Sequence, residues 1–141
     1  MPSIVRNDVA EACLRRLLVK EGYELSKPKR KGQTGVDIIA TKGAERFHIE
    51  VIGYKSTGPS RSKDFYEVFF RAISRIKNGA THCVIALPSR AGLGLPQRAR
   101  QYGIAWQRIG KTFPELRIWL VDVERRFYTK TTWSEWLNTN R

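Results

Sequence analysis

The sequence predicts a single α/β domain in which a central mixed β-sheet is flanked by helices. The 141 residues are 41% hydrophobic and 28% charged. A chain of this size buries about two-thirds of its unfolded surface, enough for a core without disulfides or structural metals. Helical and strand-like hydrophobic patterns alternate along it. No repeat or long linker divides it, so we expect one domain over residues 1–141, with a core at about 8–123 and a helical tail at about 124–141.

The first predicted element is a helix over residues 8–21. Asp8 and Glu11 have the spacing of a capping box, apolar residues follow with a helical period, and a glycine comes next as a stop signal. A short extended segment is expected at 23–25. A basic loop at 27–32, interrupted by proline and glycine, then leads toward the centre of the sheet.

Two strands are expected next, at residues 36–41 and 46–54. The first is nearly continuous in apolar residues, which is typical of a buried strand. The second alternates and is rich in residues that favour strands. The connection at 42–45 contains Gly43 and has the length of a tight turn. We therefore expect an antiparallel hairpin over residues 35–54.

The second half of the chain alternates further helices and strands. Apolar spacing and stop signals predict, in order, a helix at 63–78, a strand at 81–87, a short helix at 96–102, and strands at 104–109 and 116–123. Gly79 is placed to end the first of these helices. Thr132 and Glu135 have capping-box spacing and predict a short helix near the C-terminus.

Charge is the most informative property of the composition. Twenty-six Lys and Arg against thirteen Asp and Glu give a net charge of +13. A small domain with this charge repels itself, so we expect a polyanionic partner; the alternative is a basic surface with no specific ligand. No run reaches the ~18 apolar residues of a membrane span, and no helix joins a broad apolar face to a lysine-rich one. The expected partner is therefore nucleic acid and not a membrane.

The expected compartment follows from the N-terminus and the cysteines. Arg6 and Asp8 lie where a secretory signal would need an apolar stretch. Cys13 and Cys83 cannot form a metal site of C-x-x-C spacing, and two unpaired thiols suit a reducing compartment. We therefore expect a cytoplasmic, nucleoid-associated protein.

The feature that carries chemistry is a pair of carboxylates. Asp37 lies early in the first strand of the hairpin and Glu50 late in the second, so a turn centred near Gly43 places them opposite each other. Opposed residues on one face have Cβ atoms about 4.5–5.5 Å apart, and two carboxylates at that distance repel. A divalent cation removes the repulsion, because Mg²⁺ takes one or two carboxylates and accepts phosphate oxygens. In a basic protein this pattern favours hydrolysis of a phosphodiester.

The residues around this pair resemble a known family. Gly-Val-Asp-Ile-Ile at 35–39 and Phe-His-Ile-Glu-Val-Ile at 47–52 are similar to the core motif of the PD-(D/E)XK nucleases, which include restriction endonucleases, Mrr-like enzymes and Holliday-junction resolvases. The family core is a helix, a β-meander, a crossover helix and a strand, which resembles the order expected here. The resemblance implies that Asp37 and Glu50 bind Mg²⁺ or Mn²⁺. It also implies that Glu11, where several members carry a further acid, belongs to the site.

One position departs from the family pattern. The family's lysine stands two residues after the second acid, and here that position is Ile52, which can neither orient water nor stabilise charge on a phosphate. Three interpretations stay open: another cation reaches the site, the metal acts alone, or the fold binds nucleic acid without cutting it. The substitute cations are Lys55, which ranks first, Lys63 and Arg71. Lys55 points away from the acids on a regular strand unless Gly53 introduces a bulge.

Each candidate also has a purely structural interpretation. In that interpretation Asp37 pairs with an arginine such as Arg46 or sits at the entrance to its strand, and Glu11 is only the capping-box residue of its helix. His48 shares a face with Glu50, and it either contacts substrate or is a structural residue of its strand.

Basic residues on both sides of the hairpin are the expected nucleic-acid contacts. They are Lys27, Lys29, Arg30 and Lys31 before Asp37, and Arg61 and Lys63 after Glu50. A second basic group comprises Arg90, Arg98 and Arg100. The tryptophans at 106, 119, 133 and 136 are expected in the core, and the last two alternatively form a dimer contact or stack on a base.

The leading hypothesis is a metal-dependent endonuclease of restriction-endonuclease-like fold, which binds double-stranded or branched DNA and hydrolyses its phosphodiester bonds. The expected catalytic residues are Asp37, Glu50, Lys55 and Glu11. The alternative is a catalytically inactive nucleic-acid-binding module of the same fold, and a third is an RNA- or protein-associated basic domain. A homodimer is compatible with each.

Overall fold

The structure, a computed structural model, describes residues 4–138 and has a six-stranded sheet at its centre. The strands are β1 (Glu24–Leu25), β2 (Ile38–Lys42), β3 (Glu45–Val51), β4 (His82–Pro88), β5 (Leu116–Asp122) and β6 (Phe127–Thr132). The helices are α1 (Asn7–Lys20), α2 (Gly58–Ser74), α3 (Leu95–Tyr102) and α4 (Ile104–Thr112), with 3₁₀ turns η1 (Arg75–Asn78), η2 (Ser89–Gly94) and η3 (Ser134–Asn138). The α/β class expected from the sequence is confirmed.

The strands lie in the sheet in chain order, from β1 to β6. β1, β2 and β3 form an antiparallel meander, β3, β4 and β5 run parallel, and β6 returns antiparallel to β5. Parallel neighbours need a long crossover, and here α2 joins β3 to β4 while α3 and α4 join β4 to β5. The expected mixed sheet is therefore confirmed.

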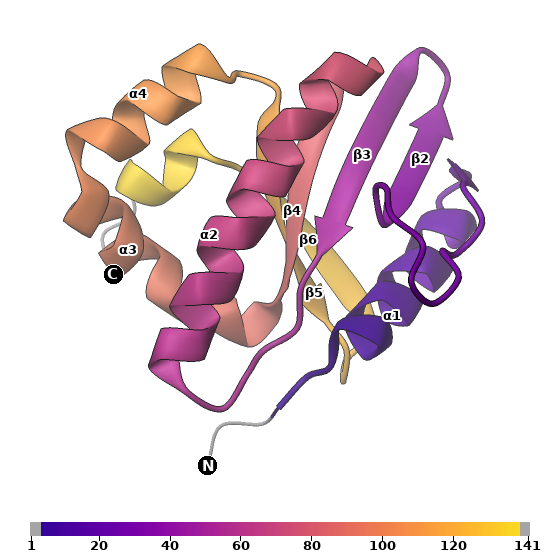
Figure 1. The fold of residues 1–141 in the computed structure, drawn as a ribbon, viewed down its shortest axis with the longest axis horizontal. Helices are drawn as coiled ribbons and strands as arrows, with labels where there is room; N and C mark the ends of the chain where they lie inside the picture. Colours follow the sequence, from indigo (N-terminus) through magenta and orange to yellow (C-terminus); the bar gives the residue numbers. More distant parts are fainter. Residues whose placement is uncertain (1–3, 139–141) are drawn as a thin grey trace.

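Helices cover both faces of this sheet (Figure 1). α1 packs on one face, where Leu14 and Ile49 belong to the same buried cluster. α2, α3 and α4 pack on the other, where Phe65 and Ile52 belong to a second cluster. Because side chains alternate along a strand, Glu50 shares the α2 face with Ile52. The meander thus presents polar residues of β3 to the crossover helix.

Residues 104–109, expected as a strand, begin the helix α4 instead. The apolar residues Ile104 and Trp106 are two apart, which suggested strand alternation, yet Trp106 is buried and Ile104 is exposed. Only a helical turn separates two such neighbours in this way. Gly103, at φ +53°, allows the sharp change of direction between α3 and α4.

The expected helical tail at 124–141 is also different, because residues 127–132 form the edge strand β6. Its threonines and aromatic residues favour a strand. The capping box at Thr132 and Glu135 is confirmed, since Thr132 N donates to Glu135 Oε1 over 2.5 Å and Glu135 N to Thr132 Oγ1 over 3.3 Å. It starts the 3₁₀ turn η3 rather than an α-helix. Residues 139–141 lie outside the described residues.

Two helix starts also differ from expectation. α1 begins after Arg6 with no side-chain cap, so the proposed capping box at Asp8 and Glu11 is wrong. α2 begins at Gly58, five residues earlier than expected, where Thr57 Oγ1 accepts from Ser60 N over 3.3 Å. Within residues 4–138, no helix has the length and apolar character needed to cross a membrane.

Candidate active site at the β2–β3 hairpin

The register of the β2–β3 hairpin places Asp37 opposite Glu50. Ile38 pairs with Ile49, so the residue just before β2 faces the following residue of β3. Asp37 Oδ2 accepts a hydrogen bond from Val51 N over 2.9 Å, which fixes the aspartate at the end of the ladder. Ile38 and Ile49 face α1, so the two carboxylates share the opposite, α2-covered face.

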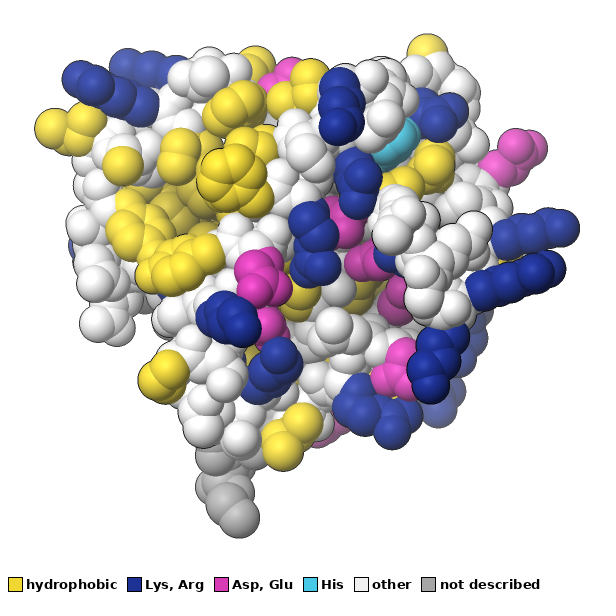
Figure 2. Space-filling model, viewed as in Figure 1, with side chains coloured by type: hydrophobic (Ala, Val, Ile, Leu, Met, Phe, Trp, Pro, Cys, Tyr) yellow, Lys and Arg dark blue, Asp and Glu magenta, His cyan; other side chains and the backbone are white. Residues whose placement is uncertain are grey.

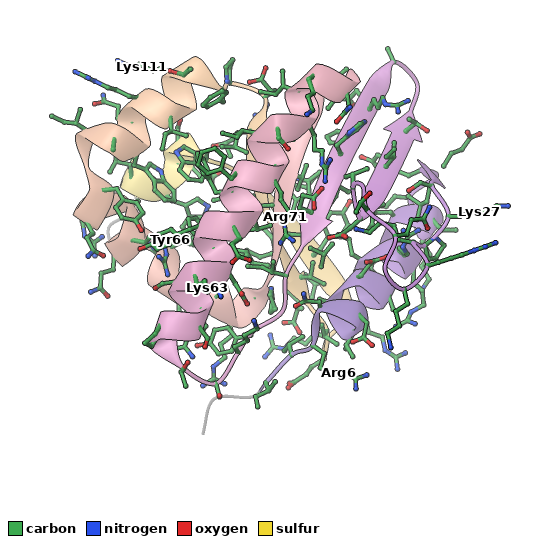
Figure 3. The ribbon with its side chains drawn as sticks, viewed as in Figure 1. Arg6, Lys27, Lys63, Tyr66, Arg71 and Lys111 are labelled. Carbon is green, nitrogen blue, oxygen red and sulfur yellow. The ribbon has the colours of Figure 1, made fainter. Side chains whose placement is uncertain are left out.

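The Glu50 carboxylate is buried beneath α2, where two arginines reach it. Its side chain is 2% exposed; Arg75 Nε lies 3.0 Å from Oε2 and Arg71 Nε lies 3.9 Å from Oε1. Burial raises the pKa of Glu50 and the nearby Asp37 raises it further, against the lowering effect of the Arg75 hydrogen bond and of both arginine charges. In Figure 3, Arg71 lies on the side of α2 that faces β3.

The Asp37 carboxylate has its own cation. Lys29 Nζ lies 2.9 Å from Asp37 Oδ1 and also donates to Gly35 O over 2.8 Å. These two contacts of Lys29 therefore hold the basic loop against Asp37. The cluster thus contains two carboxylates, Asp37 and Glu50, and three cations, which are Lys29, Arg71 and Arg75. Its formal net charge is +1 before any metal ion binds.

Glu11 is separate from the acid pair in the structure. Its Oε2 accepts from Arg15 Nε over 2.8 Å, and Arg15 also donates to the backbone oxygens of Ser26 and Asp37. Glu11 thus orients the arginine that anchors the start of β2. Among residues 4–138, no three His, Cys, Asp or Glu side chains gather into a group that could hold a metal ion.

The expected substitutes for the family lysine have different positions. Lys55, ranked first, lies 3.0 Å from Asp64, and Lys63 lies 4.0 Å from Glu67. β3 ends at Val51, before Gly53 and Lys55. A Cβ on Gly53 would lie 2.0 Å from Val5 O, so the glycine permits close packing against the N-terminal segment. Of the three candidate cations, Arg71 reaches Glu50.

Arg75 contacts Glu50 in the structure and was not predicted from the sequence as a member of the candidate site. Arg71 and Arg75 are four residues apart, a spacing that puts two side chains on one side of a helical segment. That signal was available in the sequence. The spacing of the two arginines identified no partner, however, because the packing of α2 on the sheet decides which of its faces lies over β3.

His48 has a structural environment next to the acids. Its Nε2 atom lies 2.9 Å from the Nε atom of Arg46, so Arg46 pairs with His48 and not with Asp37. Burial, with the charges of Arg46 and Arg75, lowers the pKa of His48. Its Nδ1 atom is buried and has no hydrogen-bond partner among residues 4–138. Burial and the contact with Arg46 thus give His48 a structural role in its strand.

The other predicted basic contacts divide into two groups. Lys27, Arg30 and Lys31 are exposed on the loop, and Lys27 projects from the edge of the molecule in Figure 3. Arg61 belongs elsewhere: it lines a cavity of about 510 Å³ between α2, η2 and α3, together with Arg90 and Arg98. Figure 2 shows Lys and Arg interspersed with Asp and Glu across the middle of this face, with apolar side chains gathered between α4 and α2.

Comparisons with known proteins add no relative. No family model matches the chain, and neither a curated protein nor a solved structure matches it. The resemblance to the PD-(D/E)XK nucleases therefore stays a prediction from the motif and from the element order.

Proposed function

We propose that the protein binds DNA and hydrolyses its phosphodiester bonds with Mg²⁺ or Mn²⁺ held by Asp37 and Glu50. The observation that carries this proposal is the pair of carboxylates opposed on one face of the β2–β3 hairpin, in a chain of net charge +13. The order of elements from α1 to β4 resembles the nuclease core and supports the same conclusion.

The donor set suits Mg²⁺ or Mn²⁺. Each oxygen of Asp37 and Glu50 faces one nitrogen donor, and a carboxylate oxygen carries two lone pairs, so both side chains keep acceptor capacity. Mg²⁺ needs only one or two carboxylates besides water and phosphate oxygens. The metal supplies Lewis-acid stabilisation of charge on the phosphate.

The cations around the acids have distinct roles in this proposal. Arg75, 18% exposed, holds Glu50 in place and favours its ionised form. Arg71, whose side chain is 49% exposed and 3.9 Å from Glu50, is free to turn toward a phosphate and takes the place of the missing lysine. Lys29 positions Asp37 and brings the basic loop to the substrate backbone.

A second candidate, DNA binding without cleavage, is favoured by the charge balance of the cluster. The two carboxylates already lie against three cations, so their mutual repulsion is relieved without a metal ion. Ile52 is buried in the apolar cluster and offers nothing to the reaction. In this case the arginines are the phosphate contacts and the acids orient them.

A cleavage assay separates the two candidates. Linear, branched and single-stranded DNA are each incubated with the protein in Mg²⁺ or Mn²⁺, and then with chelator. Under the first proposal the wild type and Glu67→Gln cut, whereas Asp37→Asn and Glu50→Gln do not. Glu67 is a matched control because it is an exposed acid on α2 whose carboxylate lies 4.0 Å from Lys63 on the same helix. Binding by all four proteins without cutting by any would establish the second candidate.

A further inference from the structure

A second site lies beyond the acid pair, in the cavity between the start of α2, η2 and α3. Its volume is about 510 Å³, and none of the described residues that line it is acidic. Buried apolar side chains form its floor, among them Ile52, Phe65, Leu87 and Leu95. Its walls carry Arg61, Arg90 and Arg98 together with Tyr54 and Tyr66.

The three arginines of this cleft are held by aromatic rings and neutral oxygens. Arg61 lies 4.7 Å and Arg90 5.7 Å from the centroid of the Tyr54 ring, and Arg61 also donates to Lys55 O over 2.8 Å. Arg98 lies 4.7 Å from the centroid of the Phe65 ring. Over residues 4–138, none of the three forms a salt bridge with a carboxylate. Three positive charges thus face one cleft, and no described carboxylate pairs with them.

This arrangement selects a ligand that is both anionic and flat. A guanidinium group matches a phosphate with two parallel hydrogen bonds. The exposed ring of Tyr66 and the apolar floor offer a surface on which a base can stack. In Figure 3, Tyr66 lies on the side of α2 away from Arg71, toward α3. Pockets for small ligands measure about 300–1,000 Å³, so the cleft has room for one nucleotide.

We infer that this cleft binds a nucleoside phosphate, with the phosphate against Arg61, Arg90 and Arg98 and the base against Tyr66. The N-terminal end of α2 borders the cleft at Gly58 and presents the positive end of the helix dipole to an anion. Where the nucleotide is part of a strand, the inference rests on the nucleic-acid part of the proposed function, and in neither case does it need the hydrolysis. The nucleotide is an unpaired unit of a strand or a free mononucleotide.

The position of the cleft relates it to the acid pair. Ile52 lines the cleft and lies two residues after Glu50 on the same face, about 7 Å further along the chain at the rise of a strand. An unpaired nucleotide in the cleft therefore lies next to the phosphates that the acids would face.

Fluorescence anisotropy in chelator tests the inference with three probes: a labelled single strand, a labelled duplex and a labelled adenosine monophosphate. Arg90 is exposed and Arg98 half-buried, so the variants are Arg90→Gln and Arg90→Gln/Arg98→Gln. The matched control is Arg108→Gln, an exposed arginine on α4. Melting curves verify that each variant is folded.

The cleft, with a strand as the source of the nucleotide, is supported if single-strand binding weakens at least tenfold in the double variant and less than twofold in Arg108→Gln. The same pattern for adenosine monophosphate alone supports the cleft and contradicts nucleic-acid binding by the protein. Equal single-strand binding by wild type and double variant overturns the cleft and leaves the proposed function standing. If no probe binds the wild type, both proposals fail.

Discussion

Arg75 Nε lies 3.0 Å from Glu50 Oε2 and joins the end of the crossover helix to the strand beneath it. The glutamate side chain is 2% exposed and the arginine 18%, so the pair is largely removed from water. A buried charge is tolerated when its partner stays close. This contact therefore fixes η1 against β3, and it holds one of the two acids of the hairpin in place.

Removal of Arg75 should destabilise the protein more than removal of Arg71. Arg75→Met leaves the buried Glu50 charge without its hydrogen bond and should cost about 3 kcal/mol of unfolding free energy. Arg71→Met should cost under about 1 kcal/mol, because its side chain is half exposed and 3.9 Å away. Urea denaturation measures both. Glu50→Gln in the Arg75→Met background should recover part of the loss, and a strictly additive double variant would contradict the coupling.

The Glu50 carboxyl should make stability fall as pH rises. Because its pKa in the folded state is raised above the ordinary 4.5, the folded protein holds this proton more tightly than the unfolded chain. The stabilising contribution of the Glu50 carboxyl to the free energy of unfolding is complete below pH 4.5 and declines as pH rises through the folded-state pKa. The difference in unfolding free energy between wild type and Glu50→Gln isolates this group. That difference should decline from pH 4.5 upward; a rising difference would mean that the arginine charges dominate over burial.

The stacked pair Trp106 and Trp133 should contribute strongly to the stability of the second core cluster. Trp106 and Trp133 stack with ring centroids 3.7 Å apart, and each Nε1 donates over 2.9 Å to the other's backbone oxygen. Trp133→Ala should cost about 3–5 kcal/mol, since it removes a large buried ring and the hydrogen bond from its Nε1 to Trp106 O. Trp133→Phe, which keeps most of the apolar volume, should cost less. Chemical denaturation followed by circular dichroism compares them, and equal losses would contradict a role for packing.

The hairpin that carries the acids was predictable because its signals are local. Gly43, at φ +60°, sits in the turn, and the alternation of β3 sets the face of every residue once the turn is placed. That reasoning located Asp37 opposite Glu50. α4 was not predicted, because an isolated pair of apolar residues fits both the helical and the strand period. β6 was not predicted, because an edge strand with one buried threonine has little hydrophobic signal.

The partners of the acids and the arginine cleft depend on packing between distant segments. Arg75 meets Glu50 across 25 positions of sequence, and Arg98 approaches Ser62 across 36. No spacing rule links such residues, because the angle and register at which α2 and α3 lie on the sheet decide which side chains meet. Arg61 and Arg98 were accordingly expected in different basic groups, whereas the structure brings them into one cleft.

The exposed cations of the basic loop should contribute non-specific affinity for DNA, and Lys29 should not. Lys27, Arg30 and Lys31 are exposed, whereas Lys29 is held by Asp37. Replacing the three exposed residues by Ala should make the slope of log affinity against log salt shallower by up to about 2.7, at roughly 0.9 for each phosphate released. Lys29→Ala should change the slope by less than one such step.

Asp37→Asn should have the opposite effect on affinity, for a separate reason. It removes a negative charge beside the loop and releases Lys29 to reach a phosphate, so binding in chelator should be unchanged or tighter while any cleavage disappears. Duplex anisotropy at several salt concentrations measures the slope and the affinity of all variants together. An unchanged slope in the triple variant would place the phosphate contacts at the arginine cleft instead. Equal weakening by the triple variant and Asp37→Asn, with lowered melting temperatures, would indicate misfolding, because loss of a contact and loss of a repulsion cannot have the same sign.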